Sequence, residues 1–322
     1  FTTHYIFGMK AYNDMPFTPL KHTIAKYRWL YQLGLQGPDM FFYNIPILRH
    51  RDYRNVGSYM HEHKVNAFFE CCLRRIGTIR SRQQQEEAIS YLAGFINHYI
   101  ADSICHPYVY GRIGYPVDAP TSMHHGMHAH LENELDAILL WKYKKKKPSE
   151  FNQTATICLN GQEIQFISHF LASCINETYY PITYRNNFQV TPAMVHRSIW
   201  ALRFGCRTLS DKNGKKKFGI AQVESIFVNH PVASAKMVTD SVTDYRSSCN
   251  LNHEAWGNPW DPTRVSTASF VDLFHETLDK CSRVYALLNS AVTDNMPLDK
   301  QDLSPLLAEL GNESYHSGLP VE

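Results

Sequence analysis

A histidine, an aspartate and a second histidine follow one another at four-residue spacing inside a strongly apolar segment. They are His98, Asp102 and His106, and the segment covers residues 94–106. On an α-helix this spacing places the three side chains on one stripe, about one turn apart. The other positions are apolar nearly all round, which predicts a buried helix. Because a buried carboxylate is costly unless it is paired or bound to a metal, this helix requires a cationic partner.

Helical periodicity dominates the rest of the 322-residue chain, of which 44% is hydrophobic and 19% charged. We expect an all-α fold, a multi-helix bundle that forms a single domain over residues 1–322. Its metal-site half should cover about 1–140 and a helical C-terminal half about 150–322. The predicted helices are 19–33, 57–76, 83–105, 122–144, 163–177, 191–209 and 268–290, with shorter ones near 5–14, 221–228 and 303–310.

Non-helical structure is expected in a few places. Asn160 and Gly161 lie between short apolar runs in 157–164, which predicts a tight turn between two strands. Segments rich in glycine, proline, aspartate and asparagine predict loops at 107–121, 210–219 and 244–267.

Composition excludes several classes of protein. A net charge of +2 gives no electrostatic reason to expect nucleic acid as a partner. There is no run of eighteen apolar residues and no apolar signal region near the start. The eight cysteines form no Cys-x-x-Cys pair, so reduced thiols in a cytoplasmic protein are the simpler interpretation. Because the sequence begins with Phe1, secretion after processing stays open as an alternative.

Four lysines at 144–147 end one predicted helix just before a proline. Cations suit the C-terminal end of a helix, and a solvated helix end is the ordinary interpretation. Peripheral contact with an anionic membrane surface is the alternative.

Two other predicted helices carry histidines on an apolar face. In 57–76, His61 shares its stripe with apolar residues, whereas His63 shares the opposite stripe with polar ones. In 122–144, His128 and Glu132 are four residues apart on the apolar face. His130 has the same spacing to a glutamate but falls on the far side.

Two isolated residues add to this set. Asp39 lies between a turn and an aromatic run, and His4 is surrounded by apolar positions. The complete set of inward-facing candidates is His4, Asp39, His61, His98, Asp102, His106, His128 and Glu132. Imidazole and carboxylate donors without thiolates are typical of catalytic zinc, and this number suits two or three ions.

These motifs resemble the zinc-dependent phospholipase C family, which includes the catalytic part of glycosylphosphatidylinositol phospholipase D. The family is similar in fold to the fungal single-strand nucleases. The resemblance spans residues 1 to about 140 and rests on Thr3-His4-Tyr5, Gly37-Pro38-Asp39, Met60-His61, the run from His98 through Asp102 to His106, and the run from His128 through Glu132 to Asp136. It implies an all-α fold that holds three zinc ions.

The resemblance also implies which residues hold each ion. The first ion would take Asp39, His61, His98 and Asp102. The second would take His106, His128 and Glu132. The third would be held by His4 and a bridging Asp102. The spacing from Asp102 to His106 is two residues shorter than in the secreted bacillary enzymes and nearer the phospholipase D type.

We expect phosphodiester hydrolysis by metal-activated water, and the resemblance implies a phospholipid or headgroup ester as the first candidate substrate. Asp39 would also act as general base. The candidate substrate-binding residues are Phe41, Phe42, Tyr43, His124 and His125, although core packing is the commoner role for the three aromatic residues. The alternatives are a nuclease or 3′-nucleotidase at the same metal site, and a non-catalytic protein that binds metal or lipid. The sequence does not specify the oligomeric state.

Overall fold

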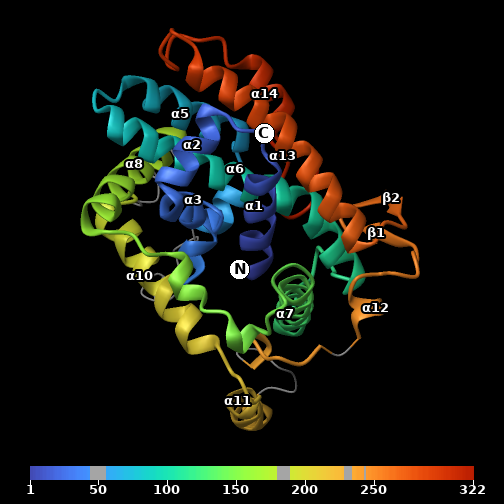
Figure 1. Ribbon diagram of the computed structural model, residues 1–322. Helices are drawn as coiled ribbons and strands as arrows, with labels where there is room; N and C mark the ends of the chain where they lie inside the picture. Colours follow the sequence, from blue (N-terminus) through green and yellow to red (C-terminus); the bar gives the residue numbers. More distant parts are fainter. Residues whose placement is uncertain (44–55, 180–188, 228–233, 243) are drawn as a thin grey trace.

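The computed structural model is built from helices packed around a long helix, α6 (Arg82–Arg112), as Figure 1 shows. It describes residues 1–43, 56–179, 189–227, 234–242 and 244–322. The other helices are α1 (Thr2–Asp14), α2 (Pro19–Lys26), α3 (Arg28–Gly34), α4 (Val56–Glu62), α5 (Val65–Thr78), α7 (Ser122–Lys144), α8 (Gly161–Tyr179), α10 (Pro192–Leu209), α11 (Lys215–Phe227), α12 (Tyr245–Ser248), α13 (Phe270–Thr293) and α14 (Ser304–Leu310). Short 3₁₀ turns lie at η1 (Gly37–Tyr43), η3 (Pro148–Glu150), η4 (Gln153–Thr156) and η5 (Ser234–Lys236). The expected all-α fold is confirmed.

Helix α6 is buried along most of its length because its side chains are apolar on nearly every face. Helices α1, α2 and α3 pack on it from the N-terminal part of the chain, and α13 packs on it from the C-terminal part. The helix continues through Pro107 to Arg112, where the sequence predicted an end at residue 105 and a loop beyond it. Tertiary packing on several faces therefore overrides the helix-breaking preference of proline.

Two glycines allow α3 and α6 to touch at the level of their backbones. A Cβ atom on Gly34 would lie 2.1 Å from the carbonyl oxygen of Tyr91, and one on Gly94 would lie 2.1 Å from that of Tyr31. This close crossing brings the chain that follows α3 against the middle of α6. The carbonyl of Leu35 consequently lies 3.1 Å from Nδ1 of His98.

Two predicted helices are each divided in the structure. The segment 19–33 forms α2 and α3, with Tyr27 between them. The segment 57–76 forms α4 and α5, and Lys64 between them adopts a left-handed conformation with φ of 48°. Residue-level periodicity continues across such breaks, so it does not reveal them.

The predicted hairpin at 157–164 is wrong. Asn160 caps α8: its Oδ1 accepts a hydrogen bond from the amide of Glu163 at 2.9 Å, and the Glu163 carboxylate accepts one from the amide of Asn160 at 2.8 Å. This reciprocal pair of hydrogen bonds is a capping box in which asparagine takes the N-cap position in place of the commoner serine or threonine. The real strands, β1 (Trp256–Asn258) and β2 (Asp261–Ser266), form an antiparallel pair inside the predicted loop 244–267.

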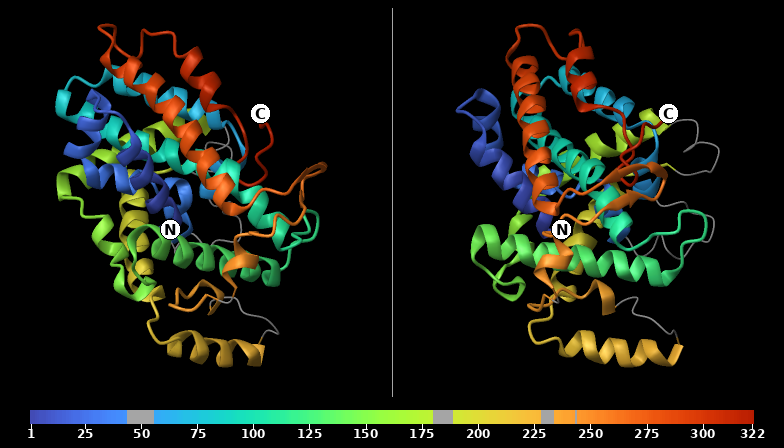
Figure 2. Two further views of the ribbon diagram at one scale, coloured as in Figure 1. Left: turned by 45° about the vertical axis from the view of Figure 1, so that its right-hand side comes forward. Right: turned by 90° about the vertical axis from the view of Figure 1, so that its right-hand side faces the viewer.

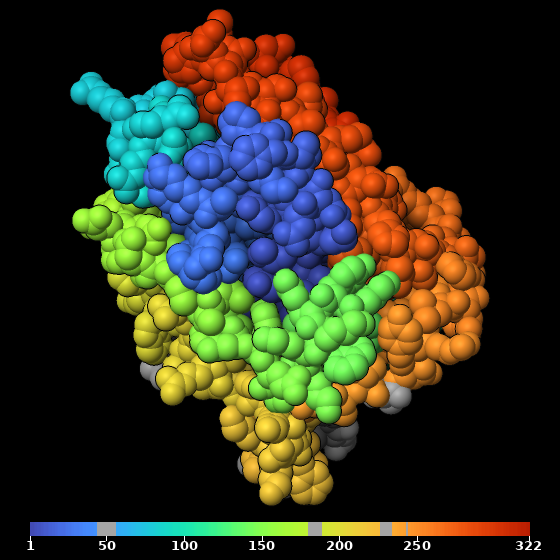
Figure 3. All heavy atoms as spheres, viewed as in Figure 1, coloured from blue at the N-terminus to red at the C-terminus, as the bar shows by residue number. Residues whose placement is uncertain are grey.

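After α14 the chain turns back toward the middle of the molecule, as the red trace in Figure 2 shows. In Figure 3, α11 projects from the end of the molecule opposite to α14. Among the described helices, none combines the length and the apolar character needed to span a bilayer.

Replacing Gly94 with alanine should lower the free energy of unfolding by about 3 kcal/mol, because the added methyl group would meet backbone atoms of α3 rather than a movable side chain. Gly219→Ala is the matched control, since Gly219 is helical and nothing lies within 4 Å of a Cβ atom there. That change should stabilise the protein by about 1 kcal/mol. Urea unfolding of both variants measures the difference, and equal effects would contradict the close crossing.

Candidate metal centre

Most of the predicted ligands form two groups. Within each group, the candidate ligand atoms all lie within 4.8 Å of one another. The first group contains Asp39, His61, His98 and Asp102, and the second contains His106, His128 and Glu132. The first group is supplied by η1, α4 and α6, and the second by α6 and α7. Helix α6 therefore contributes to both groups.

Three of the four residues of the first group are buried, and the group is incompletely hydrogen-bonded. Nε2 of His98 lies 3.1 Å from Oδ2 of Asp102, yet neither atom has a hydrogen-bond partner among the residues that the structure describes. Nε2 of His61 lies 3.2 Å from Oδ1 of Asp39 and 3.8 Å from Asp102. Buried polar atoms normally find a partner, so this arrangement leaves the donor atoms available to a shared cation.

The second group is centred on Glu132. Its Oε1 lies 3.1 Å from Nε2 of His106 and 3.1 Å from Nε2 of His128. The two histidines come from different helices, and His128 and Glu132 are one turn apart on α7 as the spacing predicted. Two imidazoles and one carboxylate with room for a further ligand are a common catalytic metal set.

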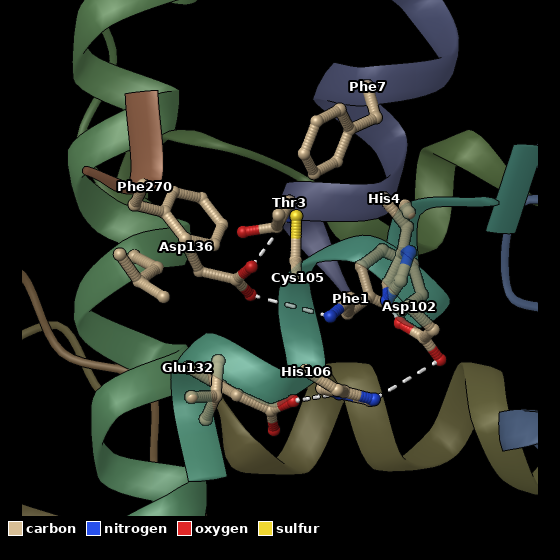
Figure 4. Close-up of a pocket in the computed structure, with 13 residues that line it drawn as sticks. Phe1, Thr3, His4, Phe7, Asp102, Cys105, His106, Glu132, Asp136 and Phe270 are labelled. Atoms are coloured by element: carbon tan, nitrogen blue, oxygen red, sulfur yellow. Dashed lines mark hydrogen bonds and ion pairs between the residues drawn. The ribbon is translucent and has the colours of Figure 1, made fainter. Parts of the chain in front are cut away.

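His4 meets the first group through Asp102. Its Nε2 lies 3.2 Å from Oδ1 of Asp102, whereas the other carboxylate oxygen faces His98. A cavity of about 40 Å³ lies between His4, Asp102, His106 and Glu132. Figure 4 shows these side chains converging on it from three helices. The space exceeds what one water molecule needs, and the position of Asp102 suits the predicted bridging role.

Three of the histidines are held by backbone carbonyl groups. Nδ1 of His61 lies 2.7 Å from the carbonyl oxygen of Gly57. Nδ1 of His98 lies 3.1 Å from that of Leu35, and Nδ1 of His106 lies 2.9 Å from that of Tyr315. When Nδ1 donates to a carbonyl, the proton is fixed there and Nε2 keeps its lone pair. Metal-binding histidines are commonly oriented in this way.

Asp136 has a role that the sequence did not reveal. Its carboxylate accepts hydrogen bonds from the amides of Thr2 at 3.0 Å and Thr3 at 2.6 Å, and so caps the start of α1. Because His4 follows directly, Asp136 fixes the helix that carries it. The available signal was the position of Asp136, four residues after Glu132 on the inward face of α7.

The histidines and carboxylates of the centre shift the pKa values of one another. Burial alone would raise the pKa of Asp102, but His106, His98 and His4 hold it well below its ordinary value. Burial also opposes ionisation of Glu132, and His128 and His106 lower its pKa. For His106, burial acts downward while Asp102 and Glu132 raise its pKa to about 10. Without metal, these carboxylates are therefore ionised and His106 is protonated at neutral pH.

The five candidate substrate residues lie in different surroundings. Phe41 is 1% exposed in the core, and Tyr43 packs against α10 at Gly205. The ring of Phe42 is partly exposed and lies 5.4 Å from that of His61.

The two histidines on α7 differ as well. Nδ1 of His124 accepts a hydrogen bond from the amide of Thr121 and so caps the helix, while His125 is exposed about 6.1 Å from the ring of Tyr115. Substrate contact by any of the five remains a prediction.

The structure also brings in His316, which the sequence did not suggest. Its ring stacks on that of His61 with centroids 4.8 Å apart and an interplanar angle of 11°. His316 lies in a non-helical segment nearly two hundred residues beyond His128, so helical periodicity carries no signal for it.

Helices that direct imidazoles and carboxylates toward shared space form a candidate metal centre, with a donor set common in metal-dependent hydrolases. The family model described as zinc dependent phospholipase C matches residues 3–183, more than half of the chain. The comparisons with curated proteins and with solved structures gave no match. The chain belongs to the zinc-dependent phospholipase C family, and its donor set fits the zinc that this family requires.

Asp102→Asn should reduce the zinc content of the purified protein by at least one equivalent, because Asp102 belongs to the first group and also contacts His4. The control is His63→Ala, which removes a histidine that lies outside both groups and should leave the zinc content unchanged. Elemental analysis of both variants decides the matter. Equal zinc loss from the two would contradict this assignment of ligands.

Zinc uptake at pH 8 should release protons. In the metal-free protein the pKa of His106 is about 10, compared with an ordinary value of about 6.5 for histidine. His106 is therefore still protonated at pH 8, where an ordinary histidine is neutral. A metal ligand must be deprotonated, so binding displaces that proton and weakens as the pH falls. Titration calorimetry in two buffers of different ionisation enthalpy measures the release, and identical heats in both would contradict it.

Proposed function

We propose that this protein is a phosphodiesterase of the phospholipase C type that acts on phospholipid headgroup esters. The observation that supports this most strongly is the pair of ligand groups joined by Asp102 beside a small cavity. Zinc bound there would stabilise negative charge on phosphoryl oxygens and lower the pKa of a water molecule. Three carboxylates against two or three divalent cations leave a positive site, which suits a phosphodiester anion.

The ligands differ in exposure, and this indicates the side from which substrate arrives. The side chains of Asp39 and Glu132 are 31% and 42% exposed, whereas those of His61, His98 and Asp102 are at most 2% exposed. The open side of the centre is therefore bordered by one carboxylate of each group. A phosphodiester entering there would reach both groups together.

Asp39 is the best-placed proton acceptor. Burial would raise its pKa, but His98 and His61 keep the pKa below its ordinary value, so the carboxylate is ionised at neutral pH. Its partial exposure gives it access to water, which the buried Asp102 lacks. We infer that Asp39 orients the attacking water and accepts its proton.

The zinc-loaded protein should hydrolyse a choline phosphodiester, and chelation should abolish this activity. Asp39→Asn should lower kcat by about 10²–10⁴-fold, the usual contribution of a general base. His63→Ala should leave kcat unchanged. Rates are compared on a short-chain phosphatidylcholine, on single-stranded DNA and on 3′-AMP. Faster hydrolysis of DNA or 3′-AMP would instead assign a nuclease or 3′-nucleotidase, and activity that survives chelation would refute the metal mechanism.

A further inference from the structure

The segment after α14 is attached to both ligand groups through one residue. The amide of Tyr315 donates to the carbonyl of His61 at 2.9 Å, and the carbonyl of Tyr315 lies 2.9 Å from Nδ1 of His106. His61 belongs to the first group and His106 to the second. The next residue, His316, therefore lies at the junction between the two ligand groups.

The turn that carries His316 is fixed on its other side as well. The side-chain Nδ2 of Asn258 donates to the carbonyl of Ser317 at 2.8 Å, and the backbone amide of Ser314 donates to the carbonyl of Leu319 at 2.8 Å. Gly318 has a φ of +60°, and a Cβ atom there would lie 2.5 Å from the carbonyl oxygen of Ser103 on α6. This position therefore requires glycine, and the segment is folded closely onto α6.

The imidazole of His316 lies against histidines of both groups. In addition to stacking on His61, its ring centroid is 5.8 Å from that of His106, with an interplanar angle of 30°. His316 nevertheless belongs to neither set of atoms that lie within 4.8 Å of one another. The geometry therefore favours contact with a bound ligand over metal coordination.

A hydrogen bond orients the ring of His316. Its Nδ1 lies 3.2 Å from the hydroxyl of Tyr110, whose ring also lies 4.5 Å from that of His128. When the tyrosine hydroxyl donates to Nδ1, the neutral imidazole carries its proton on Nε2. Among the described residues, no hydrogen bond engages Nε2 of His316. This nitrogen is the donor that the ring can offer.

We propose that His316 is a substrate-binding residue that donates a hydrogen bond from Nε2 to a phosphoryl oxygen held between the two ligand groups. This proposal rests on the proposed function, because it assumes a phosphate ester in the centre. His316 lies outside residues 3–183, which the family model matches. The C-terminal part of this chain thus contributes a specificity-determining side chain of its own.

The test compares His316→Ala and His316→Gln with His169→Ala, which removes an exposed histidine on α8. Zinc content, the affinity for inorganic phosphate as a competitive ligand, and kcat and KM for a soluble phosphodiester are measured on the zinc-loaded proteins. His316→Ala should retain its zinc, bind phosphate roughly tenfold more weakly and lose at least as much in kcat/KM, because one hydrogen bond to a charged group is lost. His316→Gln should recover part of the loss, since its amide can donate from a similar position. His169→Ala should match the wild type.

Several results would overturn the proposal. Unchanged phosphate affinity in zinc-loaded His316→Ala would exclude the hydrogen bond. Loss of zinc from both His316 variants, with retained helical circular dichroism, would make His316 part of the metal site instead. A wild-type protein that binds zinc and phosphate but hydrolyses no phosphodiester would refute the proposed function, while the phosphate affinities would still decide the role of His316.

Discussion

The arrangement of this molecule depends on the burial of one carboxylate. Asp102 is 2% exposed, and its two oxygens face different partners, His98 on one side and His4 on the other. A carboxylate in that position is tolerated only where positive charge compensates it. The histidines supply part of that charge when they are protonated, and divalent cations supply more. The segments that pack near α6 bring these compensating groups to Asp102 and its neighbours.

The sequence revealed the part of the centre that follows helical spacing. His98, Asp102 and His106 lie on one stripe, and so do His128 and Glu132, because a four-residue interval is nearly one helical turn. In the structure, His98 and Asp102 lie in the first ligand group, and His106, His128 and Glu132 lie in the second. Asp39 and His4 each had only a weak local signal, the turn before an aromatic run and the apolar surroundings, and their order along the chain, shared with a known family, strengthened it.

Other features were missed either because they depend on long-range contacts or because a local pattern was misinterpreted. His316 lies in an irregular segment, so its neighbours in sequence say nothing about its neighbours in space. The Asn160-Gly161 pair was misinterpreted because the same residues start helices and form tight turns, and only Glu163 distinguishes the two outcomes here. The helix around His98 was expected to end at residue 105, but α6 continues through Pro107 to Arg112 and is packed from both halves of the chain. Tertiary contacts therefore decided the outcome for His316 and for α6, whereas a local capping interaction decided it at Asn160.

The hydrogen bonds of Tyr315 have a consequence for how the protein matures. The residues that complete the orientation of His61 and His106 are synthesised long after the helices that carry those histidines. Metal affinity should rise during synthesis, and the fully competent centre should exist only once the chain beyond α14 has emerged and docked. Assembly of the oriented ligand groups therefore waits for the segment after α14.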